Sequence, residues 1–139
     1  MLIHRTFDYK GIQETLDKYP ELVDNFPCKE WIEDKRNIAF TDSKGSYGLL
    51  EFNSEGIYTG HYFFIVRGKK ALDLATMILE EAFLTYKIKV IRGLTPVENL
   101  GAKWMNKKLG FTYLGDVSVP QGECGIYYLS SPLLHDGEV

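Results

Sequence analysis

The sequence has few cysteines and no long apolar run, and both absences exclude classes of protein. Its 139 residues contain only two cysteines, Cys28 and Cys124, which lie far apart and outside any C-x-x-C or Cys/His ligand spacing. We therefore expect neither a disulfide framework nor a metal site. No apolar run approaches the roughly 20 residues of a membrane-spanning helix, and the N-terminus MLIHRTFDYK does not resemble an export signal. We expect a protein of the reducing cytoplasm.

An excess of positive charge is also missing. The formal net charge is −3, so the overall field of the protein repels nucleic acids and anionic membranes. We expect neither as a partner, and any anion site must be local. The basic stretch RGKK at 67–70, extended by Arg92, Lys103, Lys107 and Lys108, allows an alternative interpretation as a nucleic-acid contact, against which the overall charge argues.

The residues that are present are those of a folded domain. Hydrophobic residues make up 45% of the chain and aromatic residues 14%, which is typical of proteins that bury a core. The length suits one core and is too short for two ordinary domains. Because there is no internal repeat and no linker, we expect a single domain spanning residues 1–139.

Seven segments have the composition and spacing of β-strands. Those in the middle of the chain are separated by the turn signals DSKG and NSEG, which predicts a three-stranded antiparallel meander. The ambiguous stretch 21–36, broken at Pro27, fits a short helix or a helical loop. The expected strands are 2–7, 37–42, 46–53, 56–66, 87–94, 111–117 and 125–131.

Three other segments have helical periodicity. Residues 9–19 and 71–84 repeat apolar side chains at three- and four-residue steps. The third segment ends at Gly110, and we expect Thr95 to be its N-cap and Glu98 to complete a capping box. The resulting order of strands and helices predicts an α/β fold.

The stretch IVRGKKALDL, residues 65–74, changes from strand to helix through a short basic turn. Such a junction gathers unpaired backbone N–H groups, the positive end of a helix dipole and cationic side chains around one point, and it therefore suits an anion. The alternative interpretation is a simple strand-helix junction with solvated lysines.

A second segment, TPVENLGAKWMNKKLGF, indicates a family. It resembles the second half of the acetyl-CoA fold of the GNAT superfamily of N-acetyltransferases, with Asn99, Ala102, Gly110 and Phe111 at recurring positions. The basic turn then falls where that superfamily has its pyrophosphate loop, R/Q-x-x-G-x-G/A, and Arg67 matches its first position. The segments HYFFIVRGKKALDLA and TP-x-x-N also resemble small GNAT-type proteins encoded by bacteriophages.

The resemblance implies a fold and a cofactor. The fold is a mixed, mostly antiparallel sheet of seven strands with helices on both faces and a cleft between the fourth and fifth strands. Acetyl-CoA is the expected acyl donor, with its pyrophosphate at the N–H groups of Gly68 to Leu72, its carbonyl polarised by a backbone N–H of Phe64 to Val66, and Asn99 near its pantetheine. The implied cofactor-binding residues are Phe64, Ile65, Val66, Arg67, Gly68, Lys69, Lys70, Ala71, Leu72 and Asn99.

The sequence departs from the family at two sites. Lys70 and Leu72 replace the two later loop glycines, although Gly68 remains. Where many members have a tyrosine that protonates the leaving thiolate, this chain has Asn106, which cannot supply a proton. Weaker cofactor binding and a different acid are therefore expected, and Asn106→Tyr should raise the rate if the phenol fits the cleft.

Amine acetylation also requires a base. Glu51 and His61 are alternative candidates on neighbouring strands, and an imidazole is suited to taking a proton at neutral pH. Tyr127 and Tyr128 are candidate acids that face opposite sides of one strand, and Tyr128 is the one we name as catalytic.

The expected function is transfer of an acetyl group from acetyl-CoA to a primary amine by direct attack, because neither cysteine has a nucleophile setting. The alternative is a GNAT-fold structural or interaction protein without turnover, associated with a phage. The acceptor and the oligomeric state stay open.

Overall fold

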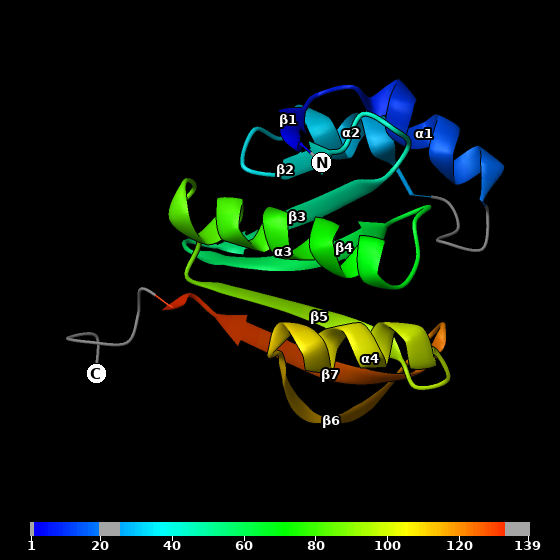
Figure 1. Cartoon of the computed structure of the whole chain (residues 1–139), viewed down its shortest axis with the longest axis vertical. Coiled ribbons are helices and arrows are strands. Elements are labelled where there is room, and N and C mark those ends of the chain that lie inside the picture. The colour runs from blue at the N-terminus through cyan, green and yellow to red at the C-terminus, as the bar shows by residue number, and fades with distance from the viewer. Residues whose placement is uncertain (1, 20–25, 133–139) are drawn as a thin grey trace.

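The computed structural model describes residues 2–19 and 26–132, which form a seven-stranded sheet with helices on both faces (Figure 1). The elements in chain order are β1 (His4–Thr6), α1 (Tyr9–Lys18), α2 (Cys28–Glu33), β2 (Ile38–Thr41), β3 (Tyr47–Ser54), β4 (Ile57–Phe63), α3 (Lys69–Leu84), β5 (Val90–Pro96), α4 (Leu100–Leu109), β6 (Thr112–Val119) and β7 (Gly122–Ser130).

The strands follow the order β1-β2-β3-β4-β5-β7-β6 across the sheet. The pair β4–β5 is parallel, and every other neighbouring pair is antiparallel. The expected fold class is therefore confirmed, including the meander of β2, β3 and β4. The parallel pair is the central discontinuity of the sheet, because α3 must cross over to connect its two strands.

Two hydrophobic clusters fix the helices to opposite faces. On one face, here called the α3–α4 face, Leu74 and Ile78 of α3 and Met105 of α4 pack with Leu50 and Ile91 of the sheet. On the other, the α1–α2 face, the sheet residues alternate with those of the first cluster, as the two-residue period of a strand requires. The second cluster consists of Ile12, Leu16, Cys28, Trp31, Ile32, Ala39, Tyr47, Leu49 and Phe63.

One predicted boundary is wrong. Thr95 does not cap a helix, since β5 continues to Pro96 and pairs there with Cys124 of β7. Thr95 is instead a buried strand residue. The helix begins at Leu100, where the side chain of Asn99 accepts a hydrogen bond from the N–H group of Ala102 and thereby takes the capping role. Pairing with a distant strand therefore overrides the local capping signal.

Other boundaries shift by a few residues. Strand β4 ends at Phe63 rather than at residue 66, and α3 begins at Lys69, two residues before the expected start. Strand β5 begins only at Val90, because Lys87 adopts a positive φ of 58° that interrupts an extended strand. In the ambiguous stretch 21–36, α2 covers the part from Cys28 to Glu33, and residues 21–25 lie outside the described residues. Across the described ranges, none of the helices combines the length and apolar composition needed to span a membrane.

Candidate active site

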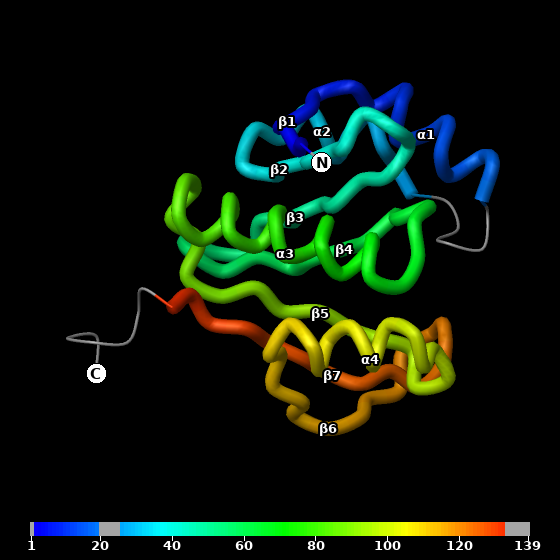
Figure 2. The backbone as a smooth tube through the Cα atoms, viewed as in Figure 1, coloured from blue at the N-terminus to red at the C-terminus, as the bar shows by residue number. Residues whose placement is uncertain are grey.

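Strands β4 and β5 separate along their length. Their pairing consists of Ile57 with Val90, Tyr58 with Ile91 and Thr59 with Arg92, and it stops there although both strands continue. Figure 2 shows the two strands diverging toward the end of the sheet where α3 and α4 begin. Beyond Thr59 and Arg92, the facing backbone polar groups of the two strands are not paired with one another.

A pocket of about 460 Å³ lies on the α3–α4 face at this divergence, and we call it the cleft. The end of β4, the turn before α3 and the first turns of α4 supply its walls. The lining residues are Tyr62, Phe64, Val66, Arg67, Gly68, Ala71, Asn99, Gly101, Ala102, Trp104 and Met105. The cleft thus lies beside the end of β4, as expected, but α4 rather than β5 forms its other wall.

The N-terminus of α3 opens into the cleft without a side-chain cap. Its N-cap is Gly68, whose φ of 61° lies in the region that favours glycine. The first helical bond runs from the Leu72 N–H to the Gly68 carbonyl at 3.0 Å, so the N–H groups of Lys69, Lys70 and Ala71 have no partner within the helix. The expected range of free N–H groups thus ends at Ala71, one residue earlier than expected.

The basic residues of this turn differ in what they contact. Arg67 donates from Nη1 to the carbonyl oxygens of Phe64 at 2.7 Å and Val66 at 3.2 Å, so it braces the turn. Lys69 Nζ lies 3.2 Å from Asp73 Oδ2, and both groups are exposed. Lys70 has no acidic partner among the described residues. Lys70 is therefore the cation of the turn that remains available to a ligand.

The residues after β4 are unequal candidates for polarising a carbonyl. The Ile65 N–H donates to Ser46 Oγ at 3.0 Å, and Ile65 does not line the cleft. Phe64 and Val66, on either side of it, do line the cleft. The alternation of an extended segment accounts for the difference. Phe64 and Val66 are thus the two of the three candidates whose side chains face the cleft.

Helix α4 contributes Asn99 but not Asn106. Asn99 Oδ1 accepts the Ala102 N–H at 3.0 Å, and the same side chain lines the cleft. Asn106 is only 3% exposed and donates from Nδ2 to Thr95 Oγ1 at 2.9 Å. Asn106 therefore joins α4 to β5 and does not reach the cleft. A tyrosine at this position would have to displace a buried hydrogen bond, so the condition for a faster Asn106→Tyr variant is not met.

The two candidate bases form one pair. Glu51 of β3 and His61 of β4 are diagonal neighbours on the α1–α2 face, and Glu51 Oε1 lies 3.0 Å from His61 Nε2. Both side chains are partly exposed, at 44% and 34%. The ring of Phe26 lies 6.4 Å from the ring of His61. A carboxylate on Nε2 fixes the orientation of the imidazole ring, so Nδ1 is the nitrogen that can accept a proton.

The two predicted acid candidates lie away from the cleft. Tyr127 pairs with Tyr113 across β6–β7, with ring centroids 5.4 Å apart. Tyr128 lies opposite Arg92 of β5, and neither Tyr127 nor Tyr128 lines the cleft. The tyrosine that does line it is Tyr62, which was not among the predicted acids. The alternation of side chains along a strand could have predicted this position, because Tyr62 directly follows His61 and must face the opposite side of the sheet.

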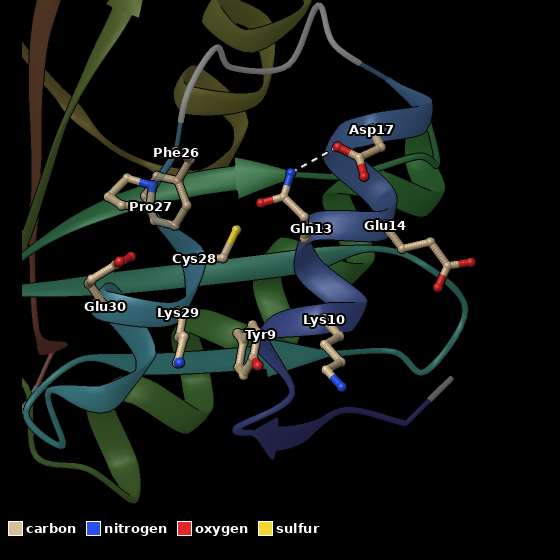
Figure 3. Close-up of a pocket in the computed structure, with 10 residues that line it drawn as sticks. All are labelled: Tyr9, Lys10, Gln13, Glu14, Asp17, Phe26, Pro27, Cys28, Lys29 and Glu30. Atoms are coloured by element: carbon tan, nitrogen blue, oxygen red, sulfur yellow. Dashed lines mark hydrogen bonds between the residues drawn. The ribbon is translucent and has the colours of Figure 1, made fainter.

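A second hollow, of about 390 Å³, lies between α1 and α2 on the α1–α2 face. Figure 3 shows side chains of both helices around it, with Cys28 between them. Phe26 lines this hollow and also contacts His61. Its charged residues are of both signs, namely Lys10, Glu14, Asp17, Lys29 and Glu30. The hollow therefore adjoins the Glu51–His61 pair through one aromatic ring.

Comparison with solved structures identifies the fold. The chain is similar to a mutant of spermidine N-acetyltransferase SpeG from Vibrio cholerae (13% identity, 100% of both chains covered, TM-score 0.74). It is also similar to a dodecameric structure of spermidine N-acetyltransferase from the same organism (14% identity, covering 97% of this chain and 96% of that one, TM-score 0.70).

A third similar structure is the aminoglycoside acetyltransferase AAC(6')-Ib in complex with coenzyme A and kanamycin (14% identity, 99% and 98% covered, TM-score 0.69). These neighbours are acetyltransferases of the GNAT fold, and the fold that the sequence resemblance implies is confirmed. No protein-family model matches the chain, and no curated protein sequence matches it.

Proposed function

We propose that this protein transfers an acetyl group from acetyl-CoA to a primary amine by direct attack. The observation that carries the proposal is the arrangement around β4. An uncapped helix N-terminus opens into the cleft on one face of this strand, and the Glu51–His61 pair lies on the other face. An anionic acyl donor and an amine acceptor therefore have separate approaches to the same strand.

The cleft has the groups that coenzyme A requires. The free N–H groups of Lys69, Lys70 and Ala71 suit a pyrophosphate, because several aligned donors and the helix dipole act on the same anion. Asn99 uses Oδ1 for its cap, so its Nδ2 can donate to the amide groups of pantetheine. A volume of about 460 Å³ is in the usual range of small-molecule sites.

Acetyl-CoA supplies an activated acyl group when bound, and residues of β4 and of the segment that follows it act on both sides of this group. The N–H group of Phe64 or Val66 donates to the acyl oxygen and stabilises negative charge there. His61 accepts the proton of the attacking amine, and Glu51 holds the imidazole ring and stabilises its positive charge. His61 and the cleft lie on opposite faces of β4, so the amine arrives from the α1–α2 face.

Direct attack of the amine on the acyl group is consistent with the burial of both cysteines. Cys28 is 3% exposed and Cys124 is 6% exposed, and both are free thiols. Burial raises the pKa of the Cys28 thiol above its ordinary value. A buried thiol is a poor nucleophile because the thiolate is the reactive form, so the amine itself attacks.

The acceptor belongs to the α1–α2 face in this proposal. Spermidine and kanamycin, named for the similar structures, both carry primary amines. A small amine, a peptide N-terminus and a protein lysine all remain candidates for this chain. The hollow beside Phe26 is the space that an extended acceptor would enter next to His61.

The single domain, the cytoplasmic location, the phage resemblance and the catalytic role of Tyr128 stay predictions.

The test combines binding with turnover. Calorimetry with coenzyme A and acetyl transfer over a panel of amines should both be positive. His61→Ala should lower kcat by roughly 10²- to 10⁴-fold without changing coenzyme A affinity, because the base acts only on the amine. Glu51→Gln should have a smaller effect, since the imidazole remains.

The alternative function makes a different prediction. A structural or interaction protein of this fold would transfer no acetyl group to any amine, even if it binds coenzyme A. Coenzyme A binding without turnover would therefore favour the alternative, and absence of both binding and turnover would remove the proposal altogether.

A further inference from the structure

We propose that Tyr62 donates a hydrogen bond to the sulfur atom that leaves the acyl donor and stabilises it as a thiolate. This inference rests on the proposed function and assigns to that site a catalytic residue of β4. Tyr62 takes the place of Tyr127 and Tyr128, the acids that were predicted because Asn106 cannot supply a proton.

The composition of the cleft restricts the choice. Among its lining residues, only Tyr62 and Arg67 have ionisable side chains. Arg67 is occupied, because Nη1 donates to the carbonyl oxygens of Phe64 and Val66. Tyr62 therefore has the one O–H group among the side chains that line the cleft.

The position of Tyr62 matches the task. It lies on β4 beyond the last residue paired with β5, Thr59, and thus where the two strands diverge. Its ring packs against Phe64 with centroids 5.3 Å apart and against the cluster that contains Met105, so its orientation is fixed. Within the described ranges its hydroxyl group has no hydrogen-bond partner. A fixed donor without a partner is prepared for a group that arrives with the ligand.

The state of the phenol supports donation. Burial raises the pKa of Tyr62 to about 12. The hydroxyl therefore keeps its proton throughout the range in which a thiol of pKa near 8.5 ionises. Full proton transfer from such a phenol to a thiolate is unfavourable, whereas a charge-assisted hydrogen bond to it is favourable. Tyr62 consequently stabilises the sulfur anion without losing its own proton.

The proposed transfer makes one bond and breaks one bond at the acyl carbon. The amine nitrogen forms a bond to the acyl carbon, the carbon–sulfur bond breaks, and its electron pair goes to sulfur. His61 takes the amine proton and releases it to water. The sulfur, held by the Tyr62 O–H, leaves as a thiolate and takes a proton from water afterwards. No oxidant or further reactant is needed.

The test measures binding apart from activity. Coenzyme A and desulfo-coenzyme A, which lacks the thiol, are titrated by calorimetry between about pH 6 and pH 10, a range that brackets the ionisation of a thiol. If Tyr62 stabilises the thiolate, the affinity for coenzyme A relative to desulfo-coenzyme A should rise about tenfold or more with pH, as expected for a hydrogen bond to a charged group.

Two variants isolate the hydroxyl group. Tyr62→Phe keeps the packed ring and should abolish the pH-dependent rise while leaving desulfo-coenzyme A affinity unchanged. Its kcat should fall by roughly 10- to 100-fold, the size of a lost charge-assisted hydrogen bond. Tyr113→Phe is the matched control, because it removes an exposed hydroxyl that donates to Asp116 and does not line the cleft.

The outcomes are distinct. If the parent binds both ligands and the rise persists in Tyr62→Phe, or disappears in Tyr128→Phe instead, the assignment to Tyr62 is wrong and the proposed function survives. If the parent binds neither ligand, the proposed function and the assignment both fail.

Discussion

Two helix N-termini open into the same cleft, and they are built differently. Helix α4 supplies its own cap, since Asn99 Oδ1 accepts the Ala102 N–H at 3.0 Å. Helix α3 begins at Gly68, which has no side chain to cap it. Both ends lie at the same end of the sheet in Figure 1. In the proposed function, the uncapped donors of α3 serve the ligand, whereas the first N–H groups of α4 are partly satisfied by Asn99.

Packing explains how α3 manages without a cap. Seven of its residues are buried, from Ala71 to Phe83, and they form much of the core on the α3–α4 face. Tertiary packing rather than capping stabilises most helices in proteins. Helix α1, which is shorter, also uses a side-chain cap, in which Asp8 accepts the Gly11 N–H. The uncapped end can thus be tested against two capped ones.

The largest effect should come from the backbone of Gly68. Gly68→Ala places a side chain at a φ of 61°, which costs about 1–3 kcal/mol of folding free energy. The turn should shift, so that the free N–H groups at the start of α3 no longer point at the pyrophosphate. Coenzyme A affinity should therefore fall by at least about tenfold. Gly110→Ala is the matched control, because its φ of 88° is also positive and it lies outside the cleft lining. An equal loss of affinity in both variants, measured by calorimetry, would contradict the comparison.

The next effect concerns Tyr62, which lines the same cleft as the two helix ends. Its pKa of about 12 is above the value of about 10 in an unfolded chain. This group's contribution to stability is therefore fully present below pH 10 and is lost as the pH rises toward 12. Urea unfolding should show a loss of about 2 kcal/mol over that range that is absent in Tyr62→Phe. Identical alkaline losses in both proteins would show that the hydroxyl is not desolvated in the cleft.

The cap of α4 should have an intermediate effect. Asn99→Ala should lower the free energy of unfolding by about 1 kcal/mol, as Asp8→Ala should in α1. Asn99→Asp should keep the cap and lose the Nδ2 donor. We expect chemical denaturation to show normal stability for Asn99→Asp and calorimetry to show weaker coenzyme A binding. Normal binding in Asn99→Asp would mean that Asn99 serves only the helix.

The smallest effect should distinguish the two lysines of α3. Lys70→Gln should weaken coenzyme A binding about two- to fivefold at low salt, since an exposed charge contributes little. Lys69→Gln should weaken it less, because Lys69 is already 3.2 Å from Asp73. Coenzyme A titrations at two salt concentrations provide the measurement. A larger loss of affinity in Lys69→Gln than in Lys70→Gln would show that Lys69, not Lys70, is the cation that contacts the ligand.

The sequence predicted the elements that depend on local signals. The turns DSKG and NSEG predicted the meander, and the apolar period after Arg67 predicted α3 within two residues. The family motif predicted a cleft beside β4, and a pocket lies at the end of that strand. Local signals could not place the end of β5, because the pairing of Pro96 with Cys124 joins distant strands.

The site was predicted less completely for the same reason. Glu51 and His61 were predicted as alternatives, and the register between β3 and β4 makes them one pair. Asn106 was treated as a cleft residue, but its side chain points into the core, where it donates a hydrogen bond to Thr95. Tyr62 could have been found from the alternation of β4 alone, since its neighbour His61 was already placed on one face.

The central claim is that coenzyme A binds with its pyrophosphate at the uncapped end of α3. Backbone amide NMR of the parent protein, titrated with coenzyme A, tests this directly. The amides of Lys69, Lys70 and Ala71 should show the largest shifts, and those that begin α1, from Tyr9 to Gly11, should show none. Coenzyme A binding that leaves the α3 amides unchanged, or that shifts only residues around the hollow between α1 and α2, would contradict the account.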